Sequence, residues 1–110
     1  TFILEASKEV PRRVSHPQRK TIGLRVPDHP ALRELLALHG APLLATTLIL
    51  PGEGEPLNDA GAILEQLGHQ IAGVIDAGAC PLAPTTVVDL SGDAPEVLRR
   101  GRGDPARLGL

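Results

Sequence analysis

The longest apolar run of the chain is P-L-L-A-T-T-L-I-L-P-G at Pro42–Gly52, with two polar residues, Thr46 and Thr47, in its middle. The run is too short to span a membrane and too rich in β-branched residues for a helix. We interpret it as a central strand that opens into a loop. Hydroxyls near the carboxyl end of such a strand are typical of ligand sites in α/β proteins. Hydrogen bonds to neighbouring backbone are the structural alternative for both threonines.

Shorter strands are predicted on both sides of this run. Alternation of apolar and polar residues, or a short buried apolar run, predicts strands at Phe2–Ala6, Thr21–Val26, Val74–Ile75 and Pro84–Asp89. The last of these is expected to form a hairpin with Glu96–Arg100, because Ser91-Gly92-Asp93 has the composition of a turn.

Two helices are predicted between the strands. The first follows Asp28-His29-Pro30, with Asp28 as the N-cap, and ends at His39 before Gly40. The second is capped by Asn58 or Asp59 and ends near Gly68. Since strand, helix and strand follow one another over Thr21–Leu50, the order predicts a crossover connection between parallel strands.

Two segments are expected to be irregular. Lys8–Lys20 contains two prolines, which forbid a continuous helix or central strand, and a cluster of cations made of Arg12, Arg13, Arg19 and Lys20. These cations are candidate contacts for phosphate or RNA, although a run of charge is also typical of a solvated surface. The tail at Gly101–Leu110 contains three glycines and one proline and is expected to be loose.

Composition narrows the possible functions. The chain of 110 residues has one phenylalanine and no tyrosine, tryptophan or methionine, so its core must be aliphatic and it lacks aromatic platforms for nucleic-acid stacking. A net charge of −2 argues against a globally basic polyanion binder. The lone cysteine, Cys80, excludes an internal disulfide, and the histidines lack metal-site spacing, so we expect a cytoplasmic protein without a structural metal and without a membrane partner.

The familiar catalytic motifs are absent. The sequence contains neither the G-x-x-x-x-G-K-[ST] and G-x-G-x-x-G phosphate loops nor the G-x-S-x-G nucleophile elbow. What remains is a set of hydroxyls and arginines at predicted strand ends, namely Arg25, Thr46, Thr47, Thr85, Thr86 and Arg99. Hydroxyls donate to phosphate oxygens and arginine neutralises them, so this set suits binding of a polyanion such as a nucleotide; no catalytic residue is assigned.

Several segments, in order along nearly all of the chain, resemble the YrdC/YciO family. They are T-F-I-L at the start, T-I-G-L-R-V-P-D-H-P at Thr21–Pro30, G-A-P-L-L-A-T-T at Gly40–Thr47, V-I-D-A-G at Val74–Gly78, P-T-T-V-V-D at Pro84–Asp89 and V-L-R-R-G at Val97–Gly101. K-E-V-P-R-R-V-S-H-P at Lys8–Pro17 and T-T-L-I-L-P-G at Thr46–Gly52 are most similar to the YciO branch.

The resemblance implies a fold and a function. The implied fold is a YrdC/RibB-like α/β domain with a twisted mixed sheet and flanking helices. Residues 1–110 would be its C-terminal part, because the chain begins directly in a predicted strand and the family's Lys-x-Arg has no counterpart here. The implied activity is that of L-threonylcarbamoyladenylate synthase, a nucleotidyltransferase of tRNA modification that uses ATP, with Mg²⁺, together with L-threonine and bicarbonate. The complete protein is expected to be the enzyme and the isolated fragment to be inactive.

The resemblance also implies which residues bind the nucleotide and substrate. Thr1 matches the last residue of the family's P-G-P-x-T, Arg25 the arginine of V-R-x-P, and Thr85 the serine of S-T-V-V-D. Arg99 matches the arginine before the closing glycine, and Thr46 and Thr47 match the start of T-S-A-N-x-S-G.

Two positions of this last motif differ. Ile49 and Pro51 replace its asparagine and second serine and cannot donate side-chain hydrogen bonds, which would weaken or redirect binding. Family members have also been described as binding double-stranded RNA. The alternative function is therefore a module for double-stranded RNA or tRNA without synthase activity, in which Arg12, Arg13, Arg19 and Lys20 make the contacts.

Overall fold

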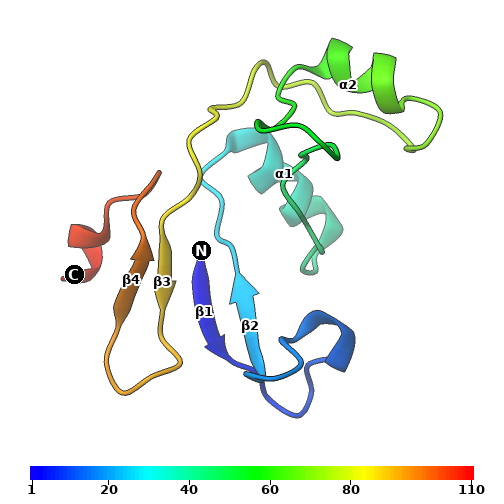
Figure 1. Ribbon diagram of the computed structural model, residues 1–110. Coiled ribbons are helices and arrows are strands. Elements are labelled where there is room, and N and C mark those ends of the chain that lie inside the picture. Colours follow the sequence, from blue (N-terminus) through cyan, green and yellow to red (C-terminus); the bar gives the residue numbers. More distant parts are fainter. The chain divides into compact units, whose positions relative to one another are not determined.

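Four short strands form one mixed sheet in the computed structural model, which describes all 110 residues (Figure 1). The strands are β1 at Phe2–Glu5, β2 at Thr21–Leu24, β3 at Val87–Asp89 and β4 at Glu96–Arg99, and their order in the sheet is β2-β1-β3-β4. β1 pairs antiparallel with β2 and parallel with β3, and β3 pairs antiparallel with β4. The predicted mixed α/β sheet is confirmed, as are the strands at 2–6, 21–26 and 84–89 and the C-terminal hairpin.

The register of the sheet separates an apolar face from a more polar one. Phe2 is paired with Leu24 on one side and Val88 on the other, whereas Ile3 is paired with Gly23 and Asp89. Because successive side chains alternate between the two faces of a sheet, the first set lies on one face and the second on the other. The predicted aliphatic core lies on the first face, where Val88 is only 2% exposed.

Two α-helices lie in the long segment between β2 and β3. α1 spans Pro30–His39 and ends at Gly40, whose φ of 70° is the left-handed conformation expected there. α2 spans Ala60–Leu67, and its N-cap Asp59 accepts a hydrogen bond from the Ala62 N–H at 2.9 Å. Both predicted helices are confirmed. Neither helix is long and apolar enough to cross a membrane.

The chain forms two compact units. One consists of 1–27 together with 83–110 and contains the whole sheet, and the other consists of 28–82 and contains both α-helices. The first unit also has two short 3₁₀ helices, η1 at Arg12–Val14 and η2 at Pro105–Leu108. Any site built within the first unit therefore draws on both ends of the sequence.

The predicted central strand at Pro42–Gly52 is wrong. These residues form neither a strand nor a helix, and Leu44 is 87% exposed. Their backbone bonds are local, from the Ile49 N–H to the Thr47 carbonyl and from the Leu57 N–H to the Leu48 carbonyl, so no neighbouring strand pairs with the run. Without that strand the predicted crossover over Thr21–Leu50 is also absent.

Two smaller predictions also differ from the structure. Val74–Ile75 is not a strand, and Ile75 is 67% exposed. The N-cap of α1 is His29, without a side-chain cap bond, because the helix begins at Pro30 and Asp28 lies one residue before the cap position. The Asp28 carboxylate lies 3.8 Å from the Arg33 guanidinium.

The C-terminal tail is ordered, contrary to the prediction of a loose segment. η2 begins after Asp104, whose carboxylate accepts a hydrogen bond from the Ala106 N–H at 3.0 Å. Pro105 is buried, and Arg102 forms a bridge with Thr85 beside β3. The composition of the tail is that of a loop, but its backbone is held by the strand next to it.

Candidate functional site

Two hydroxyls and one guanidinium meet at one end of the sheet. The side-chain oxygens of Thr1 and Thr85 are 2.8 Å apart, within hydrogen-bond distance. The Arg99 guanidinium donates from Nε to the Thr85 carbonyl at 2.9 Å and from Nη2 to the Thr85 hydroxyl at 3.4 Å. The sheet positions these groups, since Thr1 precedes β1, Thr85 precedes β3 and Arg99 ends β4. Three of the six predicted nucleotide-binding residues are thus brought together, and we call them the Thr1–Thr85–Arg99 cluster.

Arg25 belongs to the same unit as this cluster. Arg25 and Arg99 both lie near enough to the backbone nitrogen of Thr1 for their positive charges to act on it. Both guanidinium groups therefore act on the surroundings of Thr1 from different strands, Arg25 from just beyond β2 and Arg99 from β4. Both arginines are exposed, whereas Thr1 and Thr85 are half-buried. The cluster is accordingly an electropositive, partly open site.

The chemistry of this cluster is that of anion binding. It presents one hydroxyl donor that is not used in the Thr1–Thr85 bond, beside the two guanidinium groups of Arg25 and Arg99. Because Arg99 uses Nε and one Nη2 bond on Thr85, its remaining N–H groups stay available for a carboxylate or phosphate. The chain has no group of three or more His, Cys, Asp or Glu side chains that could hold a metal ion.

Thr46 and Thr47 belong to the other compact unit. Both are exposed, and the Thr46 hydroxyl makes only a long bond of 3.5 Å to the Thr47 carbonyl. The contact of Thr46 and Thr47 with a nucleotide stays a prediction. The weakening of that contact by Ile49 and Pro51 stays a prediction as well.

Thr86 has a different environment from the one expected for a phosphate contact. It is only 6% exposed, and its hydroxyl accepts a hydrogen bond from the Gly101 N–H at 3.0 Å and donates one to the Gly103 carbonyl. Being next to Thr85 in an extended segment, Thr86 points to the opposite side. The sequence shows two adjacent threonines, whose side chains alternate in a strand, but it cannot tell which of the two faces inward.

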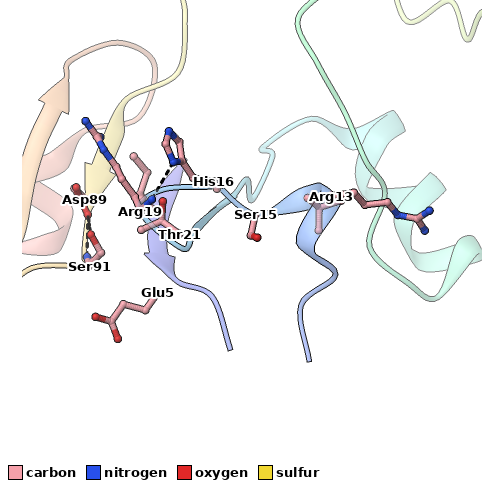
Figure 2. A pocket seen from close by; sticks show the side chains of 11 residues that line it. Glu5, Arg13, Ser15, His16, Arg19, Thr21, Asp89 and Ser91 are labelled. Atoms are coloured by element: carbon pink, nitrogen blue, oxygen red, sulfur yellow. Dashed lines mark hydrogen bonds between the residues drawn. The ribbon is translucent and has the colours of Figure 1, made fainter. Parts of the chain in front are cut away.

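The four predicted RNA-binding cations are all exposed and lie in the connection from β1 to β2. Arg13 and Arg19 line a hollow of about 670 Å³. Its lining also includes Ile3, Gly23 and Asp89 on the polar face of the sheet. Figure 2 shows the Arg19 side chain beside Asp89 and Ser91, while Arg13 points away from them. Arg13 and Arg19 therefore point in different directions, and no single ligand pose is indicated.

The hollow also contains side chains that sequence reasoning did not single out. The Asp89 carboxylate accepts hydrogen bonds from the Ser91 hydroxyl at 2.6 Å and from the Ser91 N–H at 2.8 Å, and these bonds hold the pKa of Asp89 below its ordinary value, with a smaller contribution from the Arg19 charge. His16 Nδ1 accepts the backbone N–H groups of Gln18 and Arg19. These polar groups are thus already satisfied within the chain.

Comparison with known proteins supports a family assignment. A family model for Sua5, YciO and YrdC, described as "Telomere recombination", matches residues 1–101. The protein YciO of Escherichia coli K12, which carries the description "Uncharacterized protein", is 46% identical over 104 residues that cover 94% of this chain and 50% of YciO. The threonylcarbamoyl-AMP synthase of Bacillus subtilis is 32% identical over 83 residues, covering 74% of this chain and 24% of that enzyme.

The crystal structure of Escherichia coli YciO matches with a TM-score of 0.83 and 45% sequence identity. The match covers 94% of this chain and 50% of that one. The chain therefore spans about half the length of the YciO protein it matches, and the fold follows that of YciO over nearly all of its residues.

Proposed function

Because the chain belongs to the Sua5/YciO/YrdC family, we propose that it forms part of a nucleotide-binding domain whose complete protein makes threonylcarbamoyl-AMP from ATP, L-threonine and bicarbonate. The observation that carries this proposal is the Thr1–Thr85–Arg99 cluster. A relative that matches part of the chain is a threonylcarbamoyl-AMP synthase, which supports the reaction class. The proposal includes Arg25 as a second cation at the same site.

The cluster would act on phosphate. Adenylate formation releases pyrophosphate, so negative charge must be bound and stabilised while the bond to the α-phosphorus is exchanged. Arg99 and Arg25 supply positive charge, and the hydroxyl whose O–H is not used in the Thr1–Thr85 bond supplies a directional donor. No metal-binding group of side chains is present, so Mg²⁺ enters the proposal only as an ion carried by ATP. Binding and orientation are the roles assigned to these residues.

The reaction is tested with the full-length protein, since the chain spans only part of its relatives. Pyrophosphate release would be followed with ATP, L-threonine and bicarbonate, with each substrate omitted in turn. We expect release that requires all three and that falls at least about tenfold in Arg99→Gln, which keeps polarity but removes the charge. Release no higher than in the reaction without enzyme would reject the enzymatic proposal. Residues 1–110 alone are expected to be inactive.

A second candidate is RNA binding through the exposed cations of the β1–β2 connection. Arg12, Arg13 and Lys20 make no side-chain hydrogen bond or ion pair, so their charges are available to phosphates. Binding of double-stranded RNA would be titrated at several salt concentrations, with a variant in which these three residues are glutamine. We expect the slope of log K against log salt to decrease by up to about 0.9 for each lost phosphate contact. Equal slopes for both proteins would rule out this role.

A further inference from the structure

The end of the C-terminal hairpin is fastened to β3 by one buried hydroxyl. Thr86 accepts a hydrogen bond from the Gly101 N–H at 3.0 Å and donates one to the Gly103 carbonyl, and its own N–H bonds the Arg102 carbonyl at 2.9 Å. A buried hydroxyl with both its donor and its acceptor used is a fixed connection rather than an adaptable contact. We call this arrangement the Thr86 clamp.

The clamp is continuous with further bonds along the same segment. The Arg102 N–H bonds the Pro84 carbonyl at 2.8 Å, and the Arg102 guanidinium bonds the Ala83 carbonyl at 2.9 Å. Gly101 lies so close to the Pro84 carbonyl that no Cβ would fit. Residues 83–86 and 101–103 are thus packed backbone against backbone, and little freedom is left between them.

Arg99 lies immediately before the clamp. It is two residues from Gly101, and its Nε donates to the carbonyl of Thr85, the residue before Thr86. The Arg99 side chain is exposed, so its own burial does not hold it in place. Its direction depends instead on where β4 ends relative to Thr85, which is the relationship that the clamp fixes.

We propose that Thr86 is a positioning residue of the nucleotide site: its hydroxyl locks 101–103 against β3 and thereby holds the Arg99 guanidinium on Thr85. The expected effect of Thr86 on ATP affinity rests on the proposed nucleotide function. Thr86 points away from the Thr1–Thr85–Arg99 cluster and touches no ligand there. Loss of the Thr86 hydroxyl therefore changes the affinity for ATP by releasing the Arg99 guanidinium from Thr85.

The test compares Thr86→Val, which removes the hydroxyl at nearly constant volume, with Thr86→Ser, which keeps it, in the full-length protein. Thr21→Val is the matched control, because Thr21 is a half-buried strand threonine that makes no side-chain hydrogen bond. ATP affinity is measured by calorimetry, and the Arg99 Nε–H is followed by NMR as a reporter of its bond to Thr85. Should Thr86→Val fail to fold, Thr86→Cys, with its weakly bonding thiol, takes its place.

We expect Thr86→Val to weaken ATP binding about tenfold and to speed exchange of the Arg99 Nε–H, with Thr86→Ser and Thr21→Val close to wild type. An Arg99 signal unchanged in Thr86→Val would overturn the inference, even if the variant is less stable. If wild-type protein binds no ATP but Thr86→Val still releases the Arg99 Nε–H, the nucleotide proposal fails while the positioning of Arg99 by Thr86 is supported.

Discussion

The hydroxyls of Thr1 and Thr85 lie 2.8 Å apart although 84 positions separate them in the sequence. The parallel pairing of β1 with β3 produces this contact, through the hydrogen bond from the Val88 N–H to the Thr1 carbonyl at 2.9 Å. A site made this way depends on sheet register, since a slip of one strand by one residue would place the two hydroxyls on opposite faces of the sheet. Substitutions that disturb the sheet end should therefore affect ligand binding as well as stability.

Replacing Arg99 with lysine is expected to weaken ATP binding about tenfold in the full-length protein. The planar guanidinium donates to Thr85 and still has N–H groups on its other edge for a phosphate, whereas the compact ammonium of lysine lacks this fixed fork. Calorimetric titration measures the change, and Arg100→Lys is the control because Arg100 makes no side-chain bond. An Arg99→Lys protein that binds ATP as well as wild type would show that only the positive charge matters, and equal losses in the two variants would show that the Thr85 contact is not the cause.

Gly101→Ala is expected to destabilise the protein by about 1–3 kcal/mol or more. The new Cβ would overlap the Pro84 carbonyl oxygen, and the contact is with backbone, which cannot move aside as a flexible side chain can. Gly92→Ala in the same hairpin is the control, since its nearest contact would be at 4.0 Å. Urea unfolding followed by circular dichroism gives both values. A Gly101→Ala protein as stable as Gly92→Ala would contradict the close approach.

Ser91→Ala is expected to raise the pKa of Asp89 toward its ordinary value of 3.8, because the side-chain hydrogen bond is the largest cause of its depression. A depressed carboxyl pKa contributes stability above the unfolded value of about 3.9 and loses it as the pH falls through the folded value. The stability difference between wild type and Ser91→Ala should therefore shrink below about pH 4. Carboxyl-carbon NMR titration measures the pKa, with Ser15→Ala as control, since Ser15 bonds the Arg12 carbonyl. An unmoved Asp89 titration would refute the assignment.

Asp59→Ala is expected to destabilise α2 by about 1 kcal/mol, because the Ala62 N–H loses its acceptor. Asp59→Asn keeps a side-chain oxygen at the cap and should lose much less. Hydrogen exchange of the first-turn amides of α2 distinguishes the two variants. If both variants exchanged equally fast, the charge at the helix start rather than the cap bond would be the stabilising factor.

Local pattern was sufficient for the elements whose partners are close in sequence or whose ends carry strong signals. The β3–β4 hairpin follows from its turn residues, and Asp59 and Gly68 mark the ends of α2. Of two acids at similar positions, however, only Asp59 caps a helix, while Asp28 lies beside Arg33. Propensity ranks both alike, and only the surrounding geometry decides between them.

The predictions failed where tertiary partners decide the structure. The run at Pro42–Gly52 has the composition of a strand, yet no backbone pairs with it, and a strand exists only through its partner. The reverse holds for the tail, where residues typical of a loop are fixed by the buried Thr86 hydroxyl. Within the site, resemblance to the family identified Thr1, Thr85 and Arg99, but the opposite orientations of Thr85 and Thr86 required the sheet.

The sheet draws on both ends of the chain, and this has a consequence for synthesis on the ribosome. β1 and β2 are translated in close succession and can pair with each other, but β1 lacks its parallel neighbour until Val87–Asp89 has been translated, after the whole of 28–82. During that interval one edge of β1, with Phe2 and Leu4 beside it, is open to other chains. Completion of β3 and β4 thus ends a period of vulnerability to aggregation.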